Sequence, residues 1–231
     1  MTNTIKGRLE DIRERIIQAE QHYRRTPGSV TLIAISKTRP ATDVAQAAQA
    51  KQQHFGENYL QDALPKVTAL ANMNICWHFT GPVQSNKTTQ IAQHFSWVHT
   101  IDRIKTAQRL NKQRPPQLPP LNICLQYNVS GESSKSGCSL SQLETLAAAI
   151  NAMPNLKLRG LMALPAQSSD EAQQRSAFAA VAAAQQQLIN SGYALDTLSM
   201  GMSADFEAAI AAGSTMVRVG TAIFGTRAIR N

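Results

Sequence analysis

The stretch Val30-Thr31-Leu32-Ile33-Ala34-Ile35-Ser36-Lys37 is a short apolar run that ends in a lysine and is followed by Thr38-Arg39-Pro40. Its length and the turn formers after it favour a buried strand of a parallel sheet. Lys37 then stands at the carboxyl end of that strand. An amine held against apolar neighbours reaches its neutral, nucleophilic form more easily, and it can then form a Schiff base. The ordinary alternative is a solvated lysine at a strand end.

Strand-like and helix-like segments alternate outward from this run. An amphipathic helix precedes it, with apolar residues at helical spacing at Ile5, Leu9, Ile12, Ile16 and Ala19. Further strands are predicted at 54–57, 75–79, 97–101, 121–129, 157–164, 197–200 and 215–219, and helices at 43–51, 58–70, 85–94, 103–111, 139–153, 169–190 and 204–212. The alternation predicts an α/β fold, a single (β/α)8 TIM barrel with an extra N-terminal helix over residues 1–231. No dinucleotide-binding glycine fingerprint follows the first strand, which disfavours an open doubly wound sheet.

Composition restricts the class of protein further. The formal charge of +8 indicates anionic ligands, but the basic residues are scattered and no aromatic RNA-binding signature occurs, so no nucleic-acid partner is predicted. No apolar stretch approaches the ~18 residues that span a bilayer, and the N-terminus has no signal-peptide core. We therefore expect a cytoplasmic protein with reduced cysteines and no membrane contact. The five histidines are dispersed and the three cysteines lack CxxC spacing, so the sequence predicts no metal site.

Glycine and hydroxyl residues follow the predicted seventh and eighth strands. The pairs are Gly201 with Ser203 and Gly220 with Thr221. In barrels of this type these loops commonly hold a phosphate, which backbone N–H groups and hydroxyls can bind. Each pair alone is typical of an ordinary turn. Together with a strand-end lysine across the barrel, they predict a site for pyridoxal 5'-phosphate (PLP).

Several motifs carry a resemblance to a known family. They are Ala34-Ile35-Ser36-Lys37-Thr38, Phe55-Gly56-Glu57-Asn58-Tyr59, Trp77-His78-Phe79-Thr80-Gly81, Gln84-Ser85-Asn86-Lys87, Ser134-Lys135-Ser136-Gly137, Arg159-Gly160-Leu161-Met162-Ala163, Leu198-Ser199-Met200-Gly201-Met202-Ser203 and Val217-Arg218-Val219-Gly220-Thr221-Ala222-Ile223-Phe224-Gly225. In this order, and over nearly the whole chain, the sequence resembles the pyridoxal phosphate homeostasis protein family. The resemblance implies the barrel of the alanine racemase N-terminal domain, PLP fold type III, with PLP bound as an imine.

The resemblance also implies roles for individual residues. Lys37 would form the imine, and Ser203, Gly220 and Thr221 would hold the phosphate. Arg218 would face the pyridine nitrogen, where a fixed positive charge disfavours protonation and weakens the cofactor as an electron sink. Without the resemblance, an arginine in a strand is more often a charge paired at the barrel rim.

Four further positions keep two interpretations each. Asn58 hydrogen-bonds the cofactor hydroxyl or caps the following helix. His78 lines the pocket or is a satisfied strand-end histidine. Met200 and Met202 pack against the cofactor ring or fill the core.

Two lysines keep two interpretations each, and the sequence departs from the family pattern at two places. Lys87 and Lys135 lie in polar loops near the same face, where they attract phosphate or are simply solvated. The Pro82-Val83 pair and Tyr127 replace residues more usual in the family. Neither departure touches the proposed imine or phosphate contacts.

The end of the chain bears on activity. Alanine racemase resembles this barrel but adds a β-domain, whose tyrosine reaches the site of the partner subunit, and only residues 226–231 follow Gly225 here. A second acid/base group typically contributes ~10²- to 10⁴-fold, so we expect weak chemistry at most. The leading expectation is a monomeric, non-catalytic protein that binds PLP, and related B6 vitamers, for vitamin B6 homeostasis and delivers PLP to apo-enzymes. Two alternatives stay open. One is a small PLP-dependent racemase, decarboxylase or lyase that uses Lys37 as its one base, and the other is a regulatory protein that responds to PLP occupancy.

Overall fold

The chain forms a closed barrel of eight parallel strands in sequential order. The computed structural model describes residues 4–132, 135–166, 168 and 170–226. Each strand pairs with the next along the chain, and the first pairs with the last. The strands are β1 (Thr31–Ile35), β2 (His54–Glu57), β3 (Cys76–Phe79), β4 (Trp97–Ile101), β5 (Leu121–Gln126), β6 (Leu156–Met162), β7 (Thr197–Ser199) and β8 (Met216–Val219). The predicted (β/α)8 barrel is therefore confirmed.

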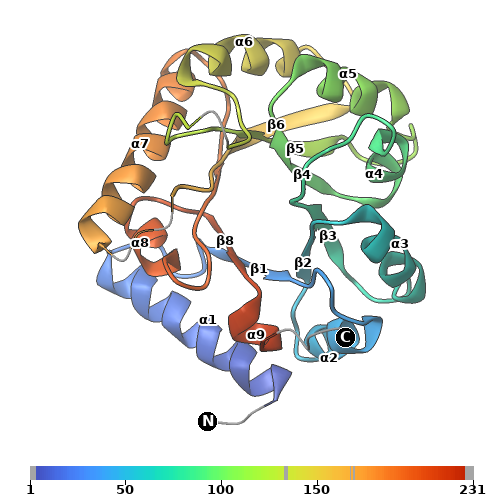
Figure 1. Ribbon diagram of the computed structural model, residues 1–231, viewed down its shortest axis with the longest axis vertical. Coiled ribbons are helices and arrows are strands. Elements are labelled where there is room, and N and C mark those ends of the chain that lie inside the picture. Colours follow the sequence, from blue (N-terminus) through green and yellow to red (C-terminus); the bar gives the residue numbers. More distant parts are fainter. Residues whose placement is uncertain (1–3, 133–134, 167, 169, 227–231) are drawn as a thin grey trace.

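Helices surround the ring of strands (Figure 1). They are α1 (Ile5–His22), α2 (Ala41–Gln49), α3 (Leu60–Ala69), α4 (Thr88–His94), α5 (Ile104–Gln113), α6 (Leu140–Asn151), α7 (Glu171–Asn190), α8 (Phe206–Ala211) and α9 (Thr221–Phe224). The extra helix α1 begins after Thr4, whose hydroxyl accepts a hydrogen bond from the Gly7 N–H at 3.2 Å. Its apolar stripe packs against α2, α8 and α9, so it closes the outer layer where the barrel's first and last strands meet.

Alternate side chains of each strand enter two different apolar layers. In β1, Leu32 and Ala34 belong to the large core between strands and helices, whereas Ile33 belongs to a smaller cluster inside the barrel, against which Ile35 packs. This alternation follows from the period of two along a strand. Trp97, Cys124, Met162 and Met216 complete the interior cluster.

The boundaries that differ from prediction have local causes. The strand predicted at 121–129 ends at Gln126, because the following loop folds back so that the Cys138 N–H donates to the Gln126 carbonyl at 2.8 Å and the Asn128 N–H to the Cys138 carbonyl at 3.0 Å. The four-residue helix α9 was not predicted, and it begins directly after Gly220. The predicted helix start at Ser169, and Ser134 of the loop motif, lie outside the described residues.

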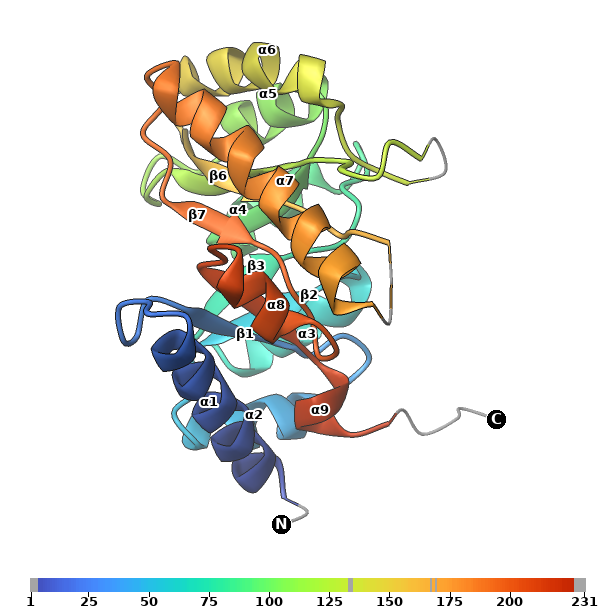
Figure 2. The same ribbon diagram turned by 90° about the vertical axis from the view of Figure 1, so that its left-hand side faces the viewer.

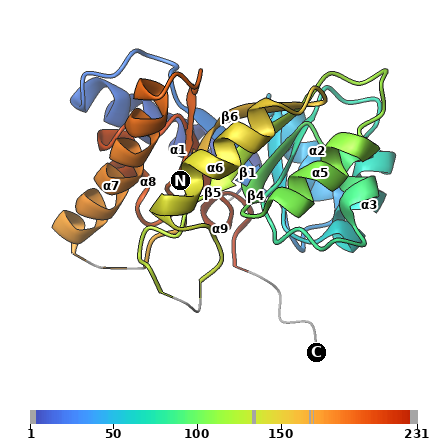
Figure 3. The same cartoon turned by 90° about the horizontal axis from the view of Figure 1, so that it is seen from above.

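The two faces of the barrel differ in their loops. Figure 2 shows the segments after β5 and β6 extending to one side, and the turn between α1 and β1 on the other. Figure 3, seen from above, separates the same two faces, with α9 on the side of the long loops. We call these the C-terminal face, where strands end, and the N-terminal face, where they begin. None of the described helices combines the length and apolar character needed to cross a membrane.

Candidate functional site

Lys37 continues the interior face of β1. It follows Ile33 and Ile35 at a spacing of two residues, so it shares their orientation toward the barrel interior, and it lies just past the end of the strand. The side chain is half-buried and lines a cavity at the C-terminal face. The strand-end placement predicted from the sequence is therefore the one observed.

A buried ion pair holds the turn that carries Lys37. The ammonium of Lys66 on α3 donates to Glu57 Oε1 at 2.7 Å and to the Ser36 carbonyl at 2.9 Å. The Ser36 hydroxyl also donates to Glu57 Oε1, at 2.6 Å. Burial raises the pKa of Glu57, and the charge of Lys66 opposes that rise. The residue before Lys37 is thus fixed through both its side chain and its carbonyl.

The residue after Lys37 is fixed as well. Thr38 has a φ of 65°, in the left-handed region that non-glycine residues seldom adopt. Its N–H donates to Asp62 Oδ2 at 2.6 Å, and the same carboxylate oxygen lies 3.1 Å from Lys66 Nζ. This carboxylate offsets the cost of the unusual turn, which directs the chain away from the barrel immediately after Lys37.

Two glycines shape the part of the cavity that follows β7 and β8. Gly201 has a φ of 94°, and a Cβ atom there would lie 2.6 Å from the Ala209 Cβ. Only glycine therefore permits the turn after β7, which brings Ser203 to the cavity. A Cβ on Gly220 would lie 3.2 Å from the Ile35 carbonyl oxygen, so a larger residue would press on the end of β1.

One cavity collects most of the predicted site residues. Its volume is about 250 Å³, and it is lined by Ile35, Lys37, Asn58, Thr80, Met162, Leu164, Met202, Ser203, Arg218, Gly220 and Thr221. Six of the eight predicted residues are among them. Met202 lines the cavity too, whereas Lys87 and Lys135 do not, and Lys135 pairs with Glu132 at 3.0 Å.

Arg218 is a buried cation held by neutral groups. Nη1 donates to the Ser199 carbonyl at 2.6 Å and to the Ser199 hydroxyl at 2.7 Å, and Nη2 donates to the Ala163 carbonyl at 3.0 Å. No carboxylate of the described residues lies within 4.0 Å of its guanidinium. Burial lowers its pKa to about 10, so it remains charged at neutral pH. The rim ion pair considered as the alternative is not the observed arrangement.

Asn58 contributes its side chain to the cavity wall rather than to a helix cap. Its Oδ1 accepts a hydrogen bond from the Thr80 hydroxyl at 2.9 Å. The helix α3 begins two residues later, with Tyr59 in the capping position. The capping interpretation of Asn58 therefore does not describe this structure.

Two predicted contacts lie elsewhere. Met200 is fully buried in the layer between strands and helices, and Met202 lines the cavity instead because the left-handed turn at Gly201, with a φ of 94°, interrupts the strand between them. His78 is fully buried inside the barrel, and it does not line the cavity. For both residues the ordinary interpretation, core packing and a satisfied histidine, fits the observed contacts.

Hydrogen bonds join His78 to Arg218 through the barrel interior. Arg218 donates to the Ser199 hydroxyl, which lies 2.9 Å from His99 Nδ1. His99 Nε2 lies 2.9 Å from His78 Nδ1, and His78 Nε2 lies 2.9 Å from His54 Nδ1. Burial lowers the pKa of His54, and it lowers those of His78 and His99 strongly, to about 3 for His99, so the chain of imidazoles is neutral at pH 7.

The cavity residues that the sequence did not single out are mainly apolar. Ile35, Met162 and Leu164 lie at or just beyond strand ends. Their position at strand ends was the available signal, but apolar residues there are equally typical of core. Within the described part of the chain, Lys37 and Arg218 are the lining residues that carry a charge, and no histidine, carboxylate, tyrosine or cysteine lines the cavity.

The fold and cavity define the class: a parallel (β/α)8 barrel with a strand-end lysine, a buried arginine and hydroxyl-bearing loops around one small pocket at the C-terminal face. Known proteins with similar sequences and structures belong to the same class. The model of the alanine racemase N-terminal domain family matches residues 8–228. A Pseudomonas aeruginosa protein named pyridoxal phosphate homeostasis protein is 53% identical over 225 residues, covering 97% of this chain and 96% of the relative.

Two further relatives extend the comparison. The Escherichia coli K12 protein of the same name is 50% identical over 228 residues, covering 97% of each chain. The structure of PipY from Synechococcus elongatus, described as having PLP bound, matches with a TM-score of 0.84 and 32% identity over 96% of this chain and all of that chain. The chain belongs to the pyridoxal phosphate homeostasis protein family, within the wider family of the alanine racemase N-terminal domain.

Proposed function

We propose that this protein is a cytoplasmic, monomeric carrier that holds PLP reversibly on Lys37 and so maintains the supply of vitamin B6 to other enzymes. The observation that carries the proposal is the convergence of an amine, the hydroxyls of Ser203 and Thr221, a glycine backbone and a buried guanidinium on one cavity of about 250 Å³. The relatives named pyridoxal phosphate homeostasis proteins, and the PLP-bound PipY structure, support it.

The covalent link is a Schiff base. The neutral amine of Lys37 would add to the aldehyde carbon of PLP with loss of one water molecule, and addition of water would reverse the link without any other reactant. Reversal by water alone suits a carrier. The concentration of free PLP aldehyde stays low, and the bound PLP can still be released.

The phosphate and the ring have separate partners. The hydroxyls of Ser203 and Thr221 and the backbone at Gly220 line one part of the cavity and provide donors for the phosphate oxygens. The side-chain amide of Asn58 is available to the cofactor hydroxyl. Arg218 provides a fixed positive charge for the ring nitrogen, which favours the unprotonated nitrogen lone pair.

The same groups favour storage over catalysis. With its fixed positive charge, Arg218 would disfavour protonation of the PLP ring nitrogen, and the cofactor would then be a weak electron sink for release of an α-proton. Apart from Lys37, no described residue lining the cavity is a suitable general acid or base at neutral pH. We therefore expect amino-acid α-proton exchange no faster than that of free PLP.

A transfer experiment tests this function. The PLP-loaded protein is mixed with a PLP-free aminotransferase, and recovery of aminotransferase activity is followed with and without a phosphatase that destroys free PLP. A carrier gives recovery that the phosphatase slows but does not abolish, and exchange of α-deuterated alanine stays at the rate of free PLP. Exchange well above that rate would instead establish a small PLP enzyme and overturn the carrier proposal. Lys37→Ala is the matched control, and it should behave like free PLP throughout.

A further inference from the structure

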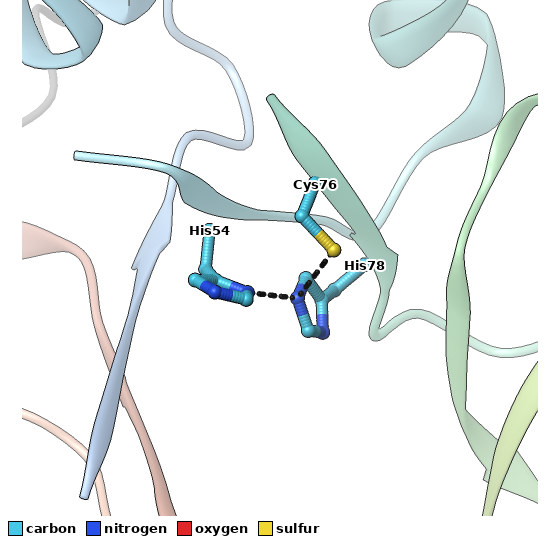
Figure 4. Close-up of side chains that lie close together, drawn as sticks. All are labelled: His54, Cys76 and His78. Atoms are coloured by element: carbon cyan, nitrogen blue, oxygen red, sulfur yellow. Dashed lines mark hydrogen bonds between the residues drawn. The ribbon is translucent and has the colours of Figure 1, made fainter. Parts of the chain in front are cut away.

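Two imidazoles and a thiol converge inside the barrel near its N-terminal face. His54 on β2 and Cys76 and His78 on β3 point toward one another (Figure 4). His54 Nδ1 lies 2.9 Å from His78 Nε2, and Cys76 Sγ lies 3.5 Å from the same nitrogen. All three potential ligand atoms lie within 4.8 Å of one another.

The strand register creates this cluster. His54 and Cys76 are direct partners across β2 and β3, so they point to the same side of the sheet. His78 follows Cys76 by two residues and therefore faces the same interior. No metal-ligand spacing is visible in the sequence because the three residues come from two strands that are separated by a helix. The dispersed histidines and cysteines predicted no metal site, and these three residues meet only in the folded barrel.

We propose that His54 Nδ1, Cys76 Sγ and His78 Nε2 form a binding site for Zn²⁺, at the opposite face of the barrel from Lys37. Two imidazole nitrogens and one thiolate are a donor set that zinc prefers, and three protein ligands leave a fourth position for water. His54 and Cys76 are half-buried whereas His78 is fully buried, so a metal ion can enter from the N-terminal face and reach its deepest ligand last.

The ligand spacing needs only a small adjustment. Ligands of tetrahedral zinc lie roughly 3.3 to 3.7 Å apart, as follows from Zn–N and Zn–S distances of about 2.0 and 2.3 Å. The 3.5 Å between Cys76 and His78 already fits, and the two imidazoles must separate by a few tenths of an ångström from 2.9 Å. His54 Nδ1 and Cys76 Sγ lie within 4.8 Å of one another, and a small rotation of the half-buried His54 ring would adjust both distances that involve its Nδ1.

The proton balance is simple. Zinc displaces one proton, that of the Cys76 thiol, and each imidazole stays neutral with its remaining proton on the nitrogen away from the metal. For His78 that nitrogen is Nδ1, which then donates to His99 Nε2 at the existing distance of 2.9 Å. His99 in turn donates from Nδ1 to the Ser199 hydroxyl, which can accept as well as donate.

This second layer of contacts is what metal-binding histidines usually have. A partner for the remote ring nitrogen fixes the tautomer and the orientation of the ligand. In this barrel the partner chain continues through Ser199 to Arg218. The proposed zinc ligand His78 is thus oriented by a chain of hydrogen bonds that ends at Arg218, near the C-terminal face.

The test uses the full-length, tag-free, PLP-loaded protein, reduced with a phosphine and treated with a chelator. Zn²⁺ affinity is measured by competition with a chromogenic chelator, and Co²⁺ is added separately as a spectroscopic probe. The variants are Cys76→Ser and His54→Gln. Matched controls are Cys138→Ser, a buried thiol outside the cluster, and His94→Gln, an exposed histidine.

The proposal predicts one Zn²⁺ per chain, with an affinity more than about 100-fold weaker in each ligand variant, since loss of a direct ligand should exceed the 10- to 100-fold typical of outer contacts. Bound Co²⁺ should give a thiolate charge-transfer band that is absent in Cys76→Ser and present in both controls. The Lys37→Ala variant should retain the site, because the site does not depend on PLP.

Two results would overturn the proposal. One is a bound Zn²⁺ whose affinity is unchanged in Cys76→Ser and His54→Gln, which would place the metal elsewhere. The other is no Zn²⁺ binding by the wild-type protein, which would leave the cluster as a hydrogen-bonded end of the histidine chain. Circular dichroism melting curves of the apo variants show that any loss of binding comes from a folded protein.

Discussion

The two faces of this barrel present contrasting chemistry. At the C-terminal face, an amine, a guanidinium and hydroxyls line a cavity suited to an anion, and most of them lie on turns just past the strands. At the N-terminal face, two imidazoles and a thiol lie within β2 and β3 themselves. Loops shape the first site, and strand register shapes the second.

The two kinds of site are not equally visible in the sequence. Loop residues after strands are found from sequence order, because every strand end of a parallel barrel meets at one face. A site within the barrel depends on which residues face inward and which are level with one another. In this protein the side chains of Ser199 and His99 link Arg218 at one face to His78 near the other. One chain of hydrogen bonds therefore runs between the two faces.

The largest change is expected in the free energy of unfolding when the buried ion pair between Lys66 and Glu57 is broken. Lys66→Met leaves Glu57 buried without its cation, and breaking such a pair typically costs about 3–5 kcal/mol. Urea unfolding should show this loss, together with a lower fraction of Lys37 that reacts with PLP. The control Lys6→Met removes an exposed pair with Glu10 and should cost less than about 1 kcal/mol. Equal losses in the two variants would contradict the view that Lys66 is a positioning residue.

The next largest change is expected in PLP affinity when the proposed phosphate contacts are removed. The double variant Ser203→Ala, Thr221→Val removes two hydroxyl donors, each worth about 1.5 kcal/mol when the acceptor is charged, so PLP should bind roughly 100-fold more weakly. Affinity for pyridoxal, which lacks the phosphate, should hardly change. The exposed Thr68→Val is the matched control, and PLP and pyridoxal affinities that fall equally would rule out these hydroxyls as phosphate contacts.

A smaller effect concerns the histidine chain between the faces. The pKa of His99 is lowered to about 3 in the folded protein, below its ordinary 6.5. Between pH 7.5 and 5.0 the unfolded chain gains a proton at this residue and the folded chain does not, so stability falls as the pH falls, by about 2 kcal/mol. Urea unfolding of His99→Asn at the two pH values should show a pH-dependent loss smaller by that amount. The exposed His94→Asn should leave the pH dependence of the wild type almost intact, and a His99→Asn curve parallel to the wild-type curve would refute the assignment.

The smallest effect tests the role of Arg218. Arg218→Gln keeps hydrogen-bonding atoms near Ser199 and Ala163 but removes the charge. Without the cation, the ring nitrogen of bound PLP should gain at least about one unit in pKa, so α-proton exchange of a bound amino acid should rise roughly tenfold. Arg218→Lys keeps the charge and serves as the control. Exchange that is unchanged in Arg218→Gln would mean that this cation does not restrain the chemistry.

Much of the fold and of the cavity was predictable from sequence, because apolar runs and their punctuation carry that information. The strands 54–57 and 97–101 were predicted with the observed bounds. Lys37, Ser203 and Thr221 were found because they follow strands, where a barrel collects its polar groups. These predictions needed only local pattern and chain order.

The remainder depends on orientation and register. Met200 and Met202 differ by two residues in a turn with a left-handed glycine between them, and sequence alone does not say which one faces the cavity. His78 and His99 meet only because neighbouring strands bring their interior faces together, with Trp97 level with His78. Lys66 is a charge on the buried face of a helix, where the apolar pattern gives no reason to expect one.

The proposed carrier function depends on covalent binding of PLP by Lys37. Borohydride reduction of the PLP-loaded protein, followed by proteolysis and mass spectrometry, tests it most directly. If Lys37 forms the Schiff base, we expect one reduced pyridoxyl phosphate group, located on Lys37, together with loss of the visible absorption of the Schiff base. The Lys37→Ala variant should carry no such group. A reduced group on another lysine in the wild-type protein would show that Lys37 is not the residue that binds PLP.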